Sequence, residues 1–186
     1  METNGTGTTA PLRDVLAAAR FAAERHKNQR RKGESAEPYV NHLLEVADLI
    51  SQATPDPDPI VLMAALLHDV VEDAGVTSAE IAEQFGDAVA SMVDEVTDDK
   101  SLPKAVRKQK QVEHAPHLSA GAQLIKLADK ISNLRGVMHN RPVGWDEPRC
   151  REYFEWAKRV ISGMRAPNPT LLAEFEAVYS QYRREA

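Results

Sequence analysis

Apolar residues recur along this chain at the three-to-four-residue spacing of amphipathic helices, and no segment shows the sustained alternation of a half-buried strand. Pro11 occupies a position typical of a first helical residue, and an apolar stripe follows it. The pattern therefore predicts a helix that begins near residue 11. The members of its stripe are Leu12, Val15, Leu16, Ala19, Ala23 and His26.

The same spacing predicts helices along the rest of the chain. His42, Val46, Leu49 and Ala53 mark one face of the second, which ends at the proline-rich break of residues 54–59. Thr77 with Glu80 forms a capping-box start for a short helix that ends near Phe85 and Gly86. Further helical stripes occupy residues 89–96, 124–134, 153–164 and 171–182.

Residues 60–67 form the longest apolar run and have no polar face. Such a run is typical of a helix that is buried on all sides. Because the chain contains no internal repeat and no long linker, we expect one all-α domain over residues 11–186. Residues 1–10 are small and polar and are interpreted as a flexible N-terminal tail.

Composition places the chain among globular proteins, since 42% of its 186 residues are hydrophobic and 27% are charged. The run at residues 60–67 is far shorter than the roughly 20 residues that span a bilayer. The first ten residues lack the basic start and the apolar stretch of a secretory signal. A single cysteine, Cys150, excludes an intramolecular disulfide and favours a cytoplasmic location, where we expect it to be a packing residue.

The net charge of −5 argues against nucleic acid as a partner, because binders of nucleic acid usually carry a basic surplus. The basic residues are concentrated locally instead, which suits a small anionic ligand better than a polymer. A group around one turn consists of Arg25, Lys27, Arg30, Arg31 and Lys32. A second group, interpreted as a solvated face, consists of Lys100, Lys104, Arg107, Lys108 and Lys110.

Four residues able to bind a metal or move protons follow the buried run directly: His68, Asp69, Glu72 and Asp73. A carboxylate buried without a partner costs several kcal/mol, so charges at this position require a cation or tight hydrogen bonds. On one continuous helix, residues three and four apart share a face. We therefore expect these four side chains to line one wall of a site.

Two further residues extend this set. His42 lies on the apolar face of its helix, where a lone histidine is more often a core residue, and Asp129 follows Ile125 by four, close to another apolar stripe. Asn133 lies one turn after Asp129 on the same face. Together the chain supplies two imidazoles and two carboxylates, a set suited to a divalent transition metal such as Mn²⁺ or Fe²⁺, with Zn²⁺ also possible.

The order His42, His68-Asp69, Asp129 resembles that of the HD-domain metal phosphohydrolases. Longer strings resemble the ppGpp hydrolase domain of RelA/SpoT-type proteins, in particular the stand-alone small alarmone hydrolases of the animal type. The resemblance covers about residues 11–165, and the combination of HDxxED with KLADK is highly specific. The matching strings are HKNQRRK (26–32), PYVNH (38–42), ALLHDVVED (65–73), VTDDK (96–100), KLADKISNLR (126–135) and EYFEWA (152–157).

The resemblance implies an HD-type helical bundle with a metal site between its helices. It makes Glu72 and Asp73 the catalytic acidic pair. Family members often have proline after the first metal histidine, whereas Leu43 stands here, a departure that removes no ligand atom. The implied metal ligands are His42, His68, Asp69 and Asp129. The implied nucleotide-binding residues are Arg31, Lys32 and Asn133, with Arg30 in the same basic turn.

The implied reaction is hydrolysis of the 3′-pyrophosphate of ppGpp or pppGpp, which releases GDP or GTP and pyrophosphate. One Mn²⁺ ion would lower the pKa of a bound water and offset charge on the phosphoryl oxygens. Glu72 would accept or relay the proton, while Asp73 orients the water or the leaving group. The arginines of the basic turn would grip phosphate in bidentate fashion, although Arg31 alternatively stacks on the base.

Three other interpretations remain open from the sequence. The first is an HD hydrolase that acts on another phosphorylated nucleotide, such as a nucleoside monophosphate, a cyclic nucleotide or a 2′-phosphorylated dinucleotide cofactor. The second is an inactive alarmone-binding module, against which the intact ligand set and acidic pair argue. The third is a helical interaction domain in which the histidines are structural. Sequence does not distinguish oligomeric states.

Overall fold

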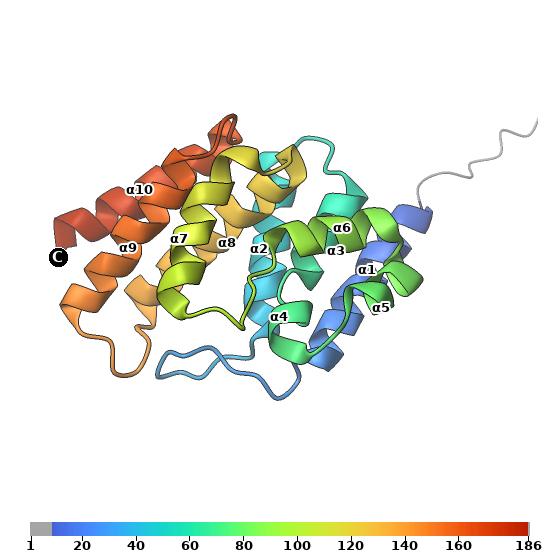
Figure 1. The fold of residues 1–186 in the computed structure, drawn as a ribbon, viewed down its shortest axis with the longest axis horizontal. Coiled ribbons are helices and arrows are strands. Elements are labelled where there is room, and N and C mark those ends of the chain that lie inside the picture. The colour runs from blue at the N-terminus through green and yellow to red at the C-terminus, as the bar shows by residue number, and fades with distance from the viewer. Residues whose placement is uncertain (1–8, 186) are drawn as a thin grey trace, which may run out of the picture.

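In a computed structural model, which describes residues 9–185, the chain is an all-α bundle, as predicted (Figure 1). Two isolated backbone bridges are the only β-type pairings among these residues. The helices are α1 (Thr9–Arg25), α2 (Val40–Ala53), α3 (Pro59–Leu67), α4 (Val70–Ala74), α5 (Ser78–Phe85), α6 (Asp87–Val96), α7 (Lys104–His114), a 3₁₀ turn η1 (Ala115–His117), α8 (Ala120–His139), α9 (Glu147–Ser162) and α10 (Pro169–Glu185).

Most helix positions expected from the apolar spacing are confirmed. The capping box is present, because the Thr77 hydroxyl accepts from the Glu80 backbone and the Glu80 carboxylate accepts from the Thr77 backbone. Helix α1 begins at Thr9, so Pro11 lies inside the first turn, where backbone N–H groups have no intrahelical partner. Of the tail predicted for residues 1–10, residues 1–8 lie outside the described part of the chain.

Two short helices were not predicted. Helix α7 contains no fully buried residue, so it has no apolar stripe for a periodicity argument to detect. Helix α4 has only five residues and follows α3 after a two-residue turn. Residues 68–73 therefore do not continue α3, which ends at Leu67, so the helical spacing used to place His68, Asp69, Glu72 and Asp73 on one wall does not apply across this turn.

Helices α3 and α8 form the centre of the bundle. Helix α3 packs against α1, α2, α6 and α8, which explains why its sequence is apolar on every side. Helix α8 packs against α2, α6, α9 and α10, and most of its residues between Ala122 and Leu134 are buried. The segments that carry the candidate site residues thus begin or end at close-packed helices.

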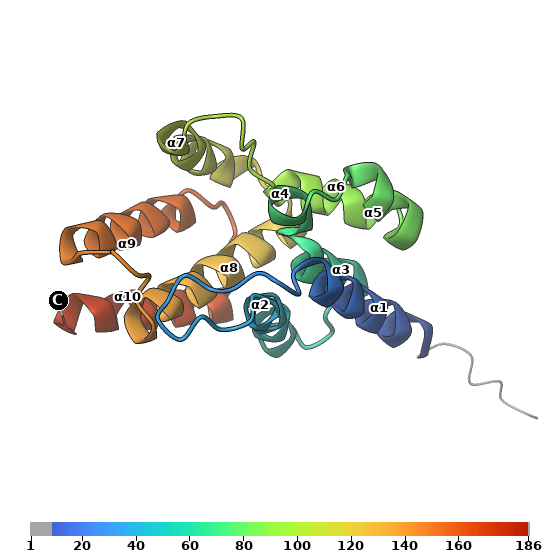
Figure 2. The same cartoon turned by 90° about the horizontal axis from the view of Figure 1, so that it is seen from below.

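Two loops run outside the helices and touch each other (Figures 1 and 2). The loop of residues 26–39 joins α1 to α2, and that of residues 140–146 joins α8 to α9. A backbone bridge links Gly33 to Pro142, and the Val143 N–H donates to the Lys32 carbonyl at 2.9 Å. A side chain at Gly33 would collide with the end of the Asn140 side chain, which would have to move, so glycine suits this close approach. Within residues 9–185, no helix combines the length and apolarity that a bilayer crossing needs.

Replacing Leu67, which is fully buried, with alanine is expected to lower the free energy of unfolding by about 2–5 kcal/mol, because it leaves a cavity at the end of α3. Urea denaturation followed by circular dichroism measures this loss. Leu12 is 61% exposed, so Leu12→Ala serves as the control and should change stability by no more than about 0.5 kcal/mol. Equal losses in the two variants would contradict the assignment of α3 to the core.

Candidate metal centre and acidic pair

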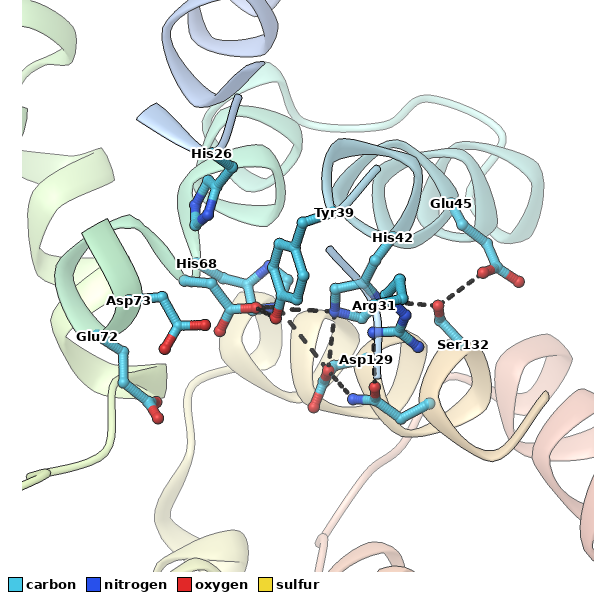
Figure 3. A network of polar contacts seen from close by, with 12 residues as sticks. His26, Arg31, Tyr39, His42, Glu45, His68, Glu72, Asp73, Asp129 and Ser132 are labelled. Carbon is cyan, nitrogen blue, oxygen red and sulfur yellow. Dashed lines mark hydrogen bonds and ion pairs between the residues drawn. The ribbon is translucent and has the colours of Figure 1, made fainter. Parts of the chain in front are cut away.

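Two histidines and an aspartate converge in the interior from different helices (Figure 3). His42 comes from the first turn of α2, and His68 and Asp69 form the turn after α3. One ligand atom from each lies within 4.8 Å of the other two. The Nε2 atoms of His42 and His68 are both buried and have no hydrogen-bond partner. Unpartnered buried nitrogens of this kind are suited to binding a metal ion at the point where they meet.

Asp129 of α8 faces the same point. Its Oδ1 atom lies 3.4 Å from Nε2 of His42 and 3.8 Å from Nε2 of His68. Asn133, one turn later, donates to that Oδ1 atom at 2.6 Å, and Lys130 donates to Oδ2 at 2.8 Å. The carboxylate is therefore fixed in orientation by its own helix.

The separations between these atoms suit a shared cation. Oδ2 of Asp69 lies 3.2 Å from Nε2 of His68 and 3.8 Å from that of His42. Around a cation with bonds of about 2.0–2.2 Å, neighbouring ligand atoms are about 3.0–3.6 Å apart. Two of the four separations lie in this range, and the two of 3.8 Å lie slightly beyond it. His42, His68 and Asp69 thus form a group that could hold a divalent metal ion, and Oδ1 of Asp129 lies beside it.

The electrostatics of the centre also require positive charge. Burial lowers the pKa of His68, but Asp69 and Asp129 outweigh burial and raise that pKa to about 10. Burial tends to raise the pKa of Asp129 too, yet Lys130 and the histidines hold it well below its usual range. Burial likewise tends to raise the pKa of Asp69, but His68 and His42 lower it. Both carboxylates are therefore held in the ionised form and attract either a proton or a cation.

His68 is oriented by the helix it ends. Its Nδ1 atom lies 2.7 Å from the carbonyl of Ala65, one of the last carbonyls of α3, which have no intrahelical N–H partner. A carbonyl only accepts, so Nδ1 carries the hydrogen and Nε2 of the neutral ring has a free lone pair. The end of α3 thus presents Nε2 to the centre.

Glu72 and Asp73 lie beside the histidines on α4, on the side away from Ser132 (Figure 3). Burial raises the pKa of Glu72, and the nearby carboxylate of Asp69 raises it further. Arg107 lies 3.5 Å from Oε1 of Glu72, and Lys100 lies 3.7 Å from the same atom and also pairs with Asp73. The interpretation of the second basic group as a solvated face is therefore wrong for these two residues.

Three supporting residues were not found from the sequence. The Tyr39 hydroxyl donates to Oδ2 of Asp69 at 2.5 Å, and the Tyr39 ring stacks on His26. Gln29 donates to Asp73 at 2.8 Å and bonds His26 at 2.6 Å. These residues lie in the loop of residues 26–39, where helical periodicity gives no signal, and only their presence in the family-like strings pointed to them.

The residues assigned to the nucleotide are only partly gathered. Arg31 donates to Oδ1 of Asn133 at 3.0 Å, and it passes over Gly136, where an added Cβ would lie 2.8 Å from the guanidinium. Lys32 is exposed on the same loop. Arg30 instead donates to the carbonyls of Lys27 and Gln29 within its own turn. Its role in binding stays a prediction.

An open pocket of about 550 Å³, a size typical of ligand sites, lies between α7, α9 and the second loop. The ring of its Tyr153 lies 5.3 Å from that of Trp156, and Nζ of Lys130 lies over the Trp156 ring while it donates to Asp129, so the pocket adjoins the centre. Burial raises the pKa of Tyr153 to about 12. Burial lowers the pKa of Lys104, and neighbouring cations, Lys32 of the first loop among them, lower it further. Its lining is Lys104, Ala105, Lys108, Trp145, Pro148, Arg149, Glu152 and Tyr153.

Comparisons with known proteins agree with this geometry. The HD domain family matches residues 18–148. The chain is 50% identical over 165 residues to guanosine-3′,5′-bis(diphosphate) 3′-pyrophosphohydrolase MESH1 of Xenopus tropicalis, covering 89% of this chain and 92% of that protein. It is 48% identical over 167 residues to the Homo sapiens protein of the same name, covering 90% and 93%.

A solved structure, described as a metazoan ortholog of SpoT that hydrolyzes ppGpp, superposes with a TM-score of 0.88 at 42% identity. The match covers 95% of this chain and 98% of that one. Sequence and structure therefore agree along almost the full length of these relatives.

We expect divalent cation to stabilise the protein against heat, because binding to the folded state alone contributes about 2.7 kcal/mol at a hundredfold excess over Kd. His42→Ala and His68→Ala should each remove this stabilisation, since each deletes a converging nitrogen. Differential scanning calorimetry with and without Mn²⁺ measures the effect. His114→Ala, on the exposed face of α7, is the control and should respond as the parent does. A full Mn²⁺ response in both site variants would show that the ion binds elsewhere.

Proposed function

The chain belongs to the HD domain family, and from this membership and the geometry of the centre we propose that it is a metal-dependent hydrolase that removes the 3′-pyrophosphate of ppGpp. The products would be GDP and pyrophosphate, or GTP and pyrophosphate from pppGpp. The observation that carries the proposal is the meeting of two unpartnered buried imidazole nitrogens with two ionised carboxylates beside an acidic pair. The names of its relatives supply the substrate.

We assign His42, His68, Asp69 and Asp129 as the ligands of one Mn²⁺ ion. Mixed nitrogen and oxygen ligands suit this metal, although the same set also accepts Fe²⁺ or Zn²⁺. When bound, a divalent cation supplies Lewis-acid polarisation of a phosphoryl oxygen and activation of water. The Tyr39 hydroxyl and the Asn133 amide hold the two carboxylates in place through their hydrogen bonds.

Glu72 is the group we assign to proton transfer. Its raised pKa brings it closer to neutrality, which suits a carboxylate that must accept a proton and pass it on. Lys100 and Arg107 counter its charge without burying it fully, as its side chain is 20% exposed. Asp73, held by Gln29 and Lys100, is assigned to orienting the water or the leaving group.

The anionic substrate requires cations beyond the centre. Arg31 and Lys32 on the first loop, together with Asn133, are assigned to the nucleotide, with Arg30 as a further candidate from the same turn. The pocket contributes Lys104, Lys108 and Arg149 beside aromatic rings, a combination that suits phosphate and a base. The proposal also includes a cytoplasmic location, with which the free, buried Cys150 is compatible.

Glu72→Gln should bind Mn²⁺ normally and hydrolyse ppGpp at least about a hundredfold more slowly, because the amide cannot accept a proton. Stopped-time product assays at saturating Mn²⁺ measure the rate. Glu152→Gln is the matched control, since Glu152 lines the pocket but lies outside the acidic pair, and it should retain turnover within about tenfold. Near-normal turnover in Glu72→Gln would move proton transfer to another residue.

The purified protein should convert ppGpp to GDP and pyrophosphate with Mn²⁺ and should stop when a chelator removes the ion. Chromatography of the nucleotide products measures this directly. A parallel panel contains a nucleoside monophosphate, a cyclic nucleotide and a 2′-phosphorylated dinucleotide. Faster turnover of any of these compounds would indicate that this compound, and not ppGpp, is the substrate. Turnover that persists with the chelator would contradict the metal-dependent mechanism.

A further inference from the structure

The ring nitrogen of His42 that faces away from the metal centre, Nδ1, has a polar partner inside the protein. Nδ1 of His42 lies 2.8 Å from Oγ of Ser132 on α8, and Oγ of Ser132 lies 2.6 Å from Oε2 of Glu45 on α2 (Figure 3). The His42 side chain is only 1% exposed, and Ser132 is equally buried. We refer to these three side chains as the relay.

The direction of hydrogen bonding along the relay follows from which groups can donate. A carboxylate only accepts, so the bond between Ser132 and Glu45 uses the single hydroxyl hydrogen of Ser132. Ser132 therefore has only lone pairs left for His42, and Nδ1 of His42 must carry the hydrogen. Nε2 of the neutral ring is then a bare lone pair, and this is the atom that faces Asp69 and Asp129.

Glu45 is itself held in the orientation that this direction requires. Its second oxygen, Oε1, accepts from Arg135 at 3.1 Å, and Arg135 also pairs with Glu174 of α10. Because both carboxylate oxygens accept hydrogen bonds, the Glu45 carboxylate is held in place and aimed at Ser132. Three helices that pack together, α2, α8 and α10, thus contribute to the orientation of one imidazole.

From this geometry we propose that Ser132 and Glu45 are positioning residues, which fix His42 in the tautomer that binds the metal ion. The proposal rests on the metal site of the proposed function. His68 obtains the same tautomer from a backbone carbonyl, which no side-chain substitution removes. His42 depends on two side chains instead, so its ligand strength is the one that mutation can change.

The test compares the Mn²⁺ affinity of Ser132→Ala and Glu45→Gln with that of the parent, by competition with a metal-binding dye. Ser132→Ala removes the acceptor for Nδ1. Glu45→Gln lets an amide N–H donate to Ser132, which frees the hydroxyl hydrogen to point at His42 and favours the wrong tautomer. Loss of such outer partners typically weakens metal affinity by about 10–100-fold, and we expect that range for both variants.

Two matched controls separate positioning from general damage. Ser51→Ala removes a serine hydroxyl from α2, the helix that carries His42 and Glu45, where this hydroxyl bonds only a backbone carbonyl. Glu176→Gln removes a partly exposed ion pair with Lys158. Both should keep the parent's Kd within about twofold, as surface changes of this kind have small effects. Circular dichroism verifies that all four variants retain helical content. If Ser132→Ala does not fold, Glu45→Gln decides, because its side chain is 36% exposed and substitution there leaves the core intact.

A second readout reports the tautomer directly. NMR of imidazole nitrogens in protein loaded with Zn²⁺, which is diamagnetic, should find the His42 hydrogen on Nδ1 in the parent and a weakened or shifted signal in the variants. Kd values within twofold of the parent in both variants, or a hydrogen on Nε2 in the parent, would overturn the proposal. If the parent binds Mn²⁺ with the expected dependence on Ser132 and Glu45 but leaves ppGpp intact, the proposed substrate is refuted while the positioning role stands.

Discussion

Four electron-rich atoms that point at one another inside a helical bundle are the constraint on which the rest of this structure depends. Two imidazole nitrogens without partners and two ionised carboxylates repel unless positive charge lies between them. The protein stabilises this arrangement at each outer edge, with Tyr39 on Asp69 and with Lys130 on Asp129. We propose that a cation at the centre would satisfy all four atoms, and a divalent cation in such a position supplies the positive charge that phosphate hydrolysis needs.

The side chains that face the metal centre and those assigned to the substrate lie in different parts of the fold. The side chains that face the metal centre lie in or beside close-packed helices, where packing against neighbours fixes their orientation. Of the cations assigned to the substrate, Arg31 and Lys32 lie on the first loop, whereas Lys104, Lys108 and Arg149 lie on α7 and α9. The first loop is tied to the second by the Gly33–Pro142 bridge and by a hydrogen bond from Ser35 to Asn140. Loops of this kind adapt to a ligand more readily than a helix does, and they commonly carry recognition on a rigid scaffold. Chemistry and recognition are thus separated but adjacent.

An acidic chain can bind an anionic substrate because its charges are sorted by position. The net charge of −5 is spread over the molecule, whereas the centre is surrounded by Lys100, Arg107 and Lys130, and the adjoining pocket by Lys104 and Arg149. We propose that these cations partly offset the four carboxylates of the centre and attract the phosphates of the substrate. Local complementarity, and not overall charge, controls which ligand a cleft attracts.

Sequence alone determined the all-α class and most helix positions, because burial leaves a periodic signal. The motif strings also singled out the residues that the structure brings together at the centre, whose role as metal ligands stays a prediction. Sequence did not reveal α7 or the break after Leu67, since a polar surface helix and a two-residue turn leave no such signal. Only the tertiary structure placed Ser132 against His42, Glu45 against Ser132, and Tyr39 against Asp69. Those contacts join residues up to 90 positions apart, and their distances depend on how helices pack, which no local pattern encodes.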